Sequence, residues 1–145
     1  MRLPTTAPRR RSAASSRRSE RGAAAIELAL LLPLLVVIVF GIVEFSIAFN
    51  RQQGLHAAAR EGARLASLPQ STTGEIRTRV DESLQGVLPA GHARTITVSP
   101  SGSRPCQGRS GETVTVTVRT DNDVVVPVWD SFTVTLTGRG EFRCE

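Results

Sequence analysis

A carboxylate stands where an apolar segment of this chain begins. Residues 23–49 contain only two charged side chains, Glu27 near the start and Glu44 near the end. A carboxylate in a medium of low dielectric costs free energy unless it meets an opposite charge. Arg18 and Arg21 lie just before the segment and could pair with Glu27 if the apolar medium begins beyond it. We therefore treat the two glutamates as candidate sites of ion pairing at the edges of a membrane.

Two cysteines are the other reactive pair. Cys106 and Cys144 both follow the apolar segment, and an even number of cysteines in an oxidising compartment indicates a disulfide. Bridging them closes a loop of about 39 residues and stabilises the fold by about 3–4 kcal/mol in the chain-entropy model. The alternative is two free thiols. His56 and His92 have no patterned metal-ligating neighbours, and no Cys-x-x-Cys occurs, so we expect no metal site.

Patterns of catalysis and cofactor binding are missing from the sequence. It contains no Gly-x-Ser-x-Gly, no phosphate-binding loop, no Gly-x-Gly-x-x-Gly after a strand and no paired carboxylates in a plausible cleft. We therefore expect no enzymatic activity, no cofactor and no small-molecule substrate.

Charge is divided unevenly along the 145 residues. Residues 1–22 carry seven Arg and one acid, for a net charge of +6, whereas residues 51–145 carry eleven Arg and ten acids. An Arg-rich flank beside an apolar segment predicts a cytoplasmic N-terminus and an extracytoplasmic C-terminal domain. A nucleic-acid-binding arm is the other interpretation, but residues 1–39 contain no aromatic side chain on which a base could stack. We expect no nucleic-acid partner.

The apolar segment is long enough to cross a membrane. Residues 28–43 have no charged or hydrogen-bonding side chain, and sixteen helical residues span about 24 Å. Extending the helix to 23–49 covers a hydrocarbon core of about 30 Å. We predict a basic cytoplasmic leader over 1–22 and a transmembrane helix over 23–49. A secretory signal peptide that is removed, and a plain uncleaved anchor, are the alternatives.

A helical stalk is predicted over 50–67. Ala58, Gly62 and Ala66 repeat at a spacing of four and form a stripe of small residues, which lets another backbone approach closely. The stripe could pack against a partner helix or against the chain's own domain. Glu61 and Arg64 are spaced as an i, i+3 ion pair.

The remaining residues, 68–145, are predicted to form a small α+β head. Apolar residues at helical spacing indicate an amphipathic helix after a break at 68–74, and alternating residues indicate strands. The predicted helix spans 75–88, the strands span 94–99, 112–120 and 132–140, a turn falls at 121–123, and the apolar 124–129 with its Pro is an edge or a loop. The fold class is therefore α+β: a long N-terminal helix, a short helix and a three- to four-stranded antiparallel sheet.

Residues 20–67 resemble the TadE-like family, pseudopilin-type proteins of Tad (Flp-type) pilus assembly systems. The resemblance is carried by four elements in order: "ERG", "IELALLLP", "GIVEF" and "AAREGAR". The C-terminal "SFTVTLTGRGEFRCE" resembles the family's closing strand more loosely.

The resemblance implies processing and assembly. A prepilin peptidase, a membrane aspartic protease, would cut directly after Gly22, so that Ala23 becomes the first mature residue and Glu27 the fifth. Ala23 and Glu27 stand i, i+4 on one helical face, and cleavage exposes an α-amino group of opposite charge. In pilins this carboxylate is thought to meet the amino group of a neighbouring subunit, and we expect Glu27 and Glu44 to act in assembly.

Taken together, the residues and the resemblance predict a single-pass membrane component of a Tad-type pilus assembly or secretion system. Its expected partners are the membrane, the prepilin peptidase and other pilus-assembly proteins or pseudopilins. The alternative is a membrane-tethered extracytoplasmic binding module unrelated to pili.

Overall fold

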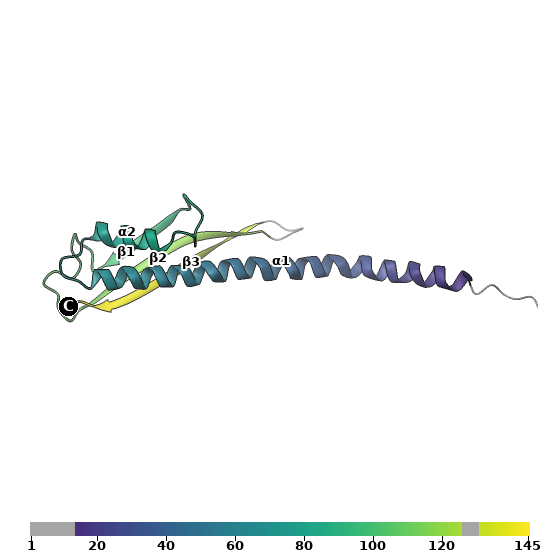
Figure 1. Ribbon diagram of the computed structural model, residues 1–145, viewed down its shortest axis with the longest axis horizontal. Helices are drawn as coiled ribbons and strands as arrows, with labels where there is room; N and C mark the ends of the chain where they lie inside the picture. Colours follow the sequence, from purple (N-terminus) through teal and green to yellow (C-terminus); the bar gives the residue numbers. More distant parts are fainter. Residues whose placement is uncertain (1–13, 126–130) are drawn as a thin grey trace, which may run out of the picture. The chain divides into compact units, whose positions relative to one another are not determined.

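The computed structural model describes residues 14–125 and 131–145 (Figure 1). It contains two helices and three strands in these residues. They are α1 (Ala14–Ala66), α2 (Thr73–Ser83), β1 (Arg94–Ser99), β2 (Thr113–Val124) and β3 (Phe132–Arg143). The α+β class, the long apolar N-terminal helix and the antiparallel sheet predicted from the sequence are confirmed.

The chain divides into two compact units within α1, between Val39 and Phe40. The described part of the first unit is helix from Ala14 onward, so the helix begins inside the predicted leader and not at Ala23. The second unit contains the rest of α1, α2 and the sheet. Each unit is described by itself below.

The sheet of the second unit has the order β1–β2–β3 with both pairs antiparallel. Val114, Val116 and Val118 of β2 are fully buried and alternate with threonines on the other face. The register places Gly140 of β3 opposite Val116, and Gly138 opposite Val118. One face of the sheet is therefore apolar, as expected for a strand with a period of two, and at the two glycines it carries no side chain.

The end of α1 and one face of α2 cover this apolar face. Leu55, Ala58, Ala59, Ala63 and Ala66 of α1 are buried in the core. From α2, Ile76 and Val80 join the same core. The predicted stalk over 50–67 and the head over 68–145 are thus joined in one compact unit.

Two glycines of β3 set how closely the sheet approaches α1. A Cβ at Gly138 would lie closer than 3.0 Å to the backbone of Leu55, and one at Gly140 equally close to the backbone of Ala59. Backbone is in contact with backbone at both positions, so no side chain can be accommodated. Glycine within a strand often marks such a close approach. Gln52 adds a hydrogen bond from its Nε2 to the carbonyl oxygen of Thr137, at 2.7 Å.

A disulfide joins the Cys106 loop to the residue that follows β3. The Cα atoms of Cys106 and Cys144 lie 5.3 Å apart and their sulfur atoms are bonded. The backbone N–H of Cys144 also donates to the carbonyl of Glu112, at 2.8 Å. The loop that connects β1 to β2 is therefore held to the C-terminus both covalently and by the backbone.

The turn predicted at 121–123 is wrong, because β2 continues through it. Asp121 and Asp123 each accept a hydrogen bond from a threonine hydroxyl across the strand pair, at 2.8 and 2.7 Å. Asn122 between them is buried and accepts a hydrogen bond from Arg51 of α1. These cross-strand partners offset the low strand propensity of Asp and Asn. The apolar residues 126–129 lie outside the described part of the chain.

The second helix is shorter than the predicted 75–88. It begins at Thr73, where Thr72 and Glu75 form a capping box, and it ends at Ser83. Gly86 adopts a φ of +82°, which glycine allows and which a helix cannot continue through. Leu84 and Leu88 remain buried although they lie beyond the helix.

Replacing Gly140 with Ala should destabilise the second unit by about 1–3 kcal/mol or more, because the new methyl group must displace the backbone of α1. Thermal unfolding of the full chain in detergent, followed by circular dichroism, measures this. Gly74→Ala is the matched control, since the nearest atom to its Cβ is the Thr72 hydroxyl at 3.9 Å. Equal midpoints for the two variants would contradict the close approach described above.

Candidate functional site

The apolar part of α1 has no cover within the described chain. Of the described residues, one helical segment, Gly22–Ala66, is long and apolar enough to cross a membrane, and its most apolar window is 0% buried. Leu30, for example, exposes 75% of its surface. So large an apolar surface needs lipid or other apolar helices around it. The helix is consistent with a single-pass membrane protein.

Gly22, Ala23 and Glu27 lie together on the exposed first part of this helix. Ala23 and Glu27 are one helical turn apart on the same face. Among the described side chains, Glu27 forms no ion pair. The side chains of Arg18 and Arg21, which the sequence offers as its partners, lie outside the described ones. Glu44, at the other end of the uncharged run, is partly buried in the second unit.

The stripe of small residues packs against the chain's own domain. Ala58, Gly62 and Ala66 are all buried in the core. A Cβ at Gly62 would lie closer than 3.0 Å to the Val80 side chain of α2. Of the two alternatives for this stripe, the structure therefore shows the one in which it faces α2 and the sheet. Gly41 differs, because a Cβ there would meet no atom within 4 Å.

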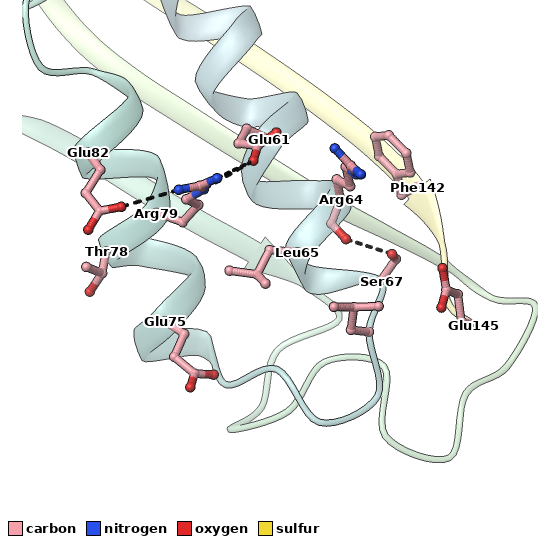
Figure 2. A pocket seen from close by; sticks show the side chains of 11 residues that line it. Glu61, Arg64, Leu65, Ser67, Glu75, Thr78, Arg79, Glu82, Phe142 and Glu145 are labelled. Atoms are coloured by element: carbon pink, nitrogen blue, oxygen red, sulfur yellow. Dashed lines mark hydrogen bonds and ion pairs between the residues drawn. The ribbon is translucent and has the colours of Figure 1, made fainter.

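A groove of about 800 Å³ opens beside the end of α1 (Figure 2). Residues of α1, α2 and β3 and of their flanks line it, with Leu65, Leu68 and Phe142 as apolar members. Arg79 of α2 bonds to Glu61 of α1 at 3.0 Å and to Glu82 at 3.6 Å. The predicted pair of Glu61 with Arg64 is therefore replaced by a pair that links the two helices. Figure 2 shows Arg79 between the two carboxylates.

The lining of this groove is mixed, with charged side chains beside apolar ones. Its other lining carboxylates are Glu75 and Glu145, and its other cation is Arg64. In the part of the chain that the structure describes, no three metal-ligating side chains lie close enough to hold an ion. Sequence reasoning missed this groove because its lining comes from three segments that only the fold brings together.

Both histidines are engaged in bonds that hold elements together. The ring Nδ1 of His56 accepts a hydrogen bond from the backbone N–H of Arg139, at 3.3 Å, which adds a contact between α1 and β3. The ring Nε2 of His92 lies 2.8 Å from the carbonyl oxygen of Asp121. Each histidine therefore has a structural role, because its ring joins two segments of the fold.

The comparisons with known proteins identify the N-terminal segment. Residues 22–64 match the family model described as TadE-like protein. The predicted resemblance to the TadE-like family is confirmed over this segment. The match covers less than a third of the 145 residues and includes Gly22, Ala23, Glu27 and Glu44. It associates this TadE-like segment with Tad pilus proteins. No curated protein and no solved structure matches the chain.

The match ends at residue 64, inside the part of α1 that is packed in the second unit. The TadE-like segment therefore includes both the exposed apolar helix and most of the α1 residues that form the core. The sheet and α2 lie outside the match. The family resemblance thus concerns the helix, and the fold of the rest is known from the structure alone.

Hydrogen bonds at the start of α2 give the second unit a dependence on pH. The backbone N–H and the hydroxyl of Thr72 both donate to the Glu75 carboxylate, at 2.8 and 2.9 Å, and lower the pKa of Glu75 below its ordinary value of 4.5. A lowered pKa in the folded state stabilises the fold above pH 4.5, and this contribution is lost as pH falls through the folded value.

Glu75→Gln should therefore lower the unfolding midpoint at neutral pH and leave it unchanged at low pH. Thermal unfolding of both proteins between about pH 3 and pH 7 tests this, because protonation of the wild-type carboxylate removes the difference. Thr72→Ala, which removes the N-cap hydroxyl, should cost about 1 kcal/mol. A difference between Glu75→Gln and wild type that is the same at every pH would contradict the assignment.

Proposed function

We propose that this protein is a pseudopilin-like, single-pass membrane component of a Tad-type pilus assembly or secretion system. It acts by helix packing and protein assembly, not by catalysis. Its leader lies in the cytoplasm and its α+β unit outside the membrane. The observation that carries the proposal is the juxtaposition of Gly22, Ala23 and Glu27 at the start of an uncovered apolar helix that matches the TadE-like family.

A cut after Gly22 would give Glu27 its opposite charge. Hydrolysis of the Gly22–Ala23 bond leaves a carboxylate on Gly22 and an ammonium group on Ala23. The two charges of a mature chain, at Ala23 and Glu27, are then on one face of the helix. In a medium of low dielectric their attraction is strong, either within one chain or between the ammonium of one subunit and the carboxylate of the next.

Gly22 also makes the bond accessible to a peptidase. The structure places Gly22 inside α1, which starts eight residues earlier at Ala14. A peptide bond has to leave the helix before a protease can cut it, and glycine costs a helix about 1 kcal/mol relative to alanine. No neighbouring atom lies within 4 Å of a Cβ built at Gly22. The residue therefore weakens the helix at the scissile bond without serving any packing contact in the described chain.

Processing predicts a defined N-terminus. The membrane form of the protein, isolated from cells with an active pilus system, should begin at Ala23 when its N-terminus is sequenced. The same protein from cells that lack the prepilin peptidase should retain its leader. A membrane form that still carries the leader in both strains would overturn the processing step.

Glu27→Gln should abolish assembly and leave membrane insertion intact, because the amide keeps the size of the side chain and loses its charge. Piliation counted by electron microscopy, with membrane fractionation of the same cells, measures the two effects. Glu44→Gln is the comparison variant. It removes the other carboxylate of the helix, which has no i, i+4 relation to Ala23, so its effect on assembly should be smaller.

A membrane-tethered binding module unrelated to pili is the second candidate. The observation in its favour is the open groove at the end of α1, whose mixed lining of Leu65, Phe142 and charged side chains fits a polypeptide segment. Normal piliation with Glu27→Gln would favour this function, because a module of this kind needs the helix only as an anchor.

A further inference from the structure

The hairpin formed by β2 and β3 ends in exposed apolar side chains. Val125 and Phe132 expose 57% and 52% of their surfaces, and Val134 exposes 38%. Phe132 is paired with Val124 in the register of the two strands. We call Val124, Val125, Phe132 and Val134 the hairpin end. Val124 is half-buried and the other three side chains are exposed, although Val124, Phe132 and Val134 lie on the face of the sheet that is buried further along.

The contacts between β3 and α1 determine which residues of α1 lie beside the hairpin end. Gly138 lies against Leu55 and Gly140 against Ala59, so two strand residues advance as far as four helix residues. The rises per residue agree, with about 6.8 Å for two strand residues and about 6 Å for four helix residues. Both segments belong to the second unit, and they run in the same direction (Figure 1).

Extending the same ratio places Phe132 near Glu44. Phe132 precedes Gly138 by six residues, or about 20 Å of strand, which corresponds to about twelve residues of helix before Leu55. The hydrogen bond from Arg51 to Asn122 holds β2 to α1 along this stretch. The hairpin end is therefore level with the last residues of the uncharged apolar run, 28–43.

We infer that the hairpin end docks on the lipid surface of the membrane that α1 spans. Within the second unit, the last residues of the run, 40–43, and the hairpin end lie at one level along α1. A bilayer surface at the end of the run is therefore also the surface that the hairpin end would touch. Asp123 limits the depth, because its carboxylate, bonded to the Thr133 hydroxyl, belongs in the polar headgroup region. The inference rests on the proposed membrane span of α1.

Docking of this kind would hold the α+β unit at a fixed height above the bilayer. A single span leaves such a unit free to tilt, whereas a second contact beside the helix removes that freedom. Each apolar side chain that leaves water at the interface contributes to the free energy of membrane binding in proportion to the area it buries.

Tryptophan quenching by lipid tests this with the full chain. Trp129 is the single tryptophan of the sequence, so it is replaced by Phe in every variant. One new tryptophan is then placed by Phe132→Trp, by Phe142→Trp or by Phe40→Trp. The protein is reconstituted in phosphatidylcholine vesicles, and emission is compared with vesicles whose acyl chains carry bromine.

Phe142 is the matched control, because it is the same residue type on the same strand, is 40% exposed and lies ten residues away. We expect brominated chains to quench the tryptophan at 132 and not the one at 142. The tryptophan at 40 reports on the span itself, and its quenching is expected in either case. Quenching at 40 without quenching at 132 overturns the docking and leaves the span standing. A tryptophan at 40 that is not quenched overturns the span.

Two further outcomes are also decisive. Equal quenching at 132 and 142 overturns the inference, because the whole unit then lies on the lipid. The emission of a tryptophan at 132 could instead be shifted to the blue without being quenched, and lose that shift when the protein is diluted in lipid. This result would show that a second copy of the chain covers the hairpin end, and it would also overturn the inference.

Discussion

The second unit depends on the direct contact between the backbone of β3 and the backbone of α1. Gly138 and Gly140 leave no room for a side chain against Leu55 and Ala59, so the distance between helix and sheet is set by main-chain atoms. Ala58, Ala63 and Ala66, which α1 contributes to the same core, are small. A core this thin buries little apolar area per residue, and small domains of this kind usually need an additional constraint.

The disulfide and the polar contacts between elements supply that constraint. Cys144 follows the strand that lies against α1, and its bond to Cys106 holds the long loop before β2 to the same end of the unit. Arg79 links α2 to Glu61 of α1, and His56 receives the N–H of Arg139. Exposed ion pairs contribute little free energy by themselves, so their value lies in fixing how the elements are oriented.

The sequence predicted those parts of the fold that have a strong local pattern. The alternating valines of β2 and the small-residue stripe of α1 were sufficient to place a strand and a close-packed helical face. The pattern does not specify the partner of the stripe, because a stripe of small residues fits a neighbouring helix as well as a sheet. Gly138 and Gly140, two residues apart within a strand pattern, were the available signal that this sheet faces a backbone.

The wrongly predicted turn and the missed groove depend on tertiary contacts, which local propensity cannot detect. Asp121, Asn122 and Asp123 have the composition of a turn, but their partners on β3 and α1 make them a strand. The capping box that starts α2 was present in the sequence as Thr72-x-x-Glu75, and it marks the first turn of the helix correctly. The groove beside α1 was not predictable, since its lining joins residues up to 84 positions apart.

The candidate site followed from the sequence because it depends on position along one helix and not on tertiary contacts. Glu27 has no ionic partner among the described side chains. A carboxylate at the edge of an apolar span therefore has to obtain its opposite charge from the preceding arginines, from a new N-terminus at Ala23, or from another subunit. The first two exclude each other, because a cut that creates the amine would also remove the arginines. Processing would thus replace the leader arginines, as the opposite charge for Glu27, by an α-amino group. A neighbouring mature subunit can provide the same group.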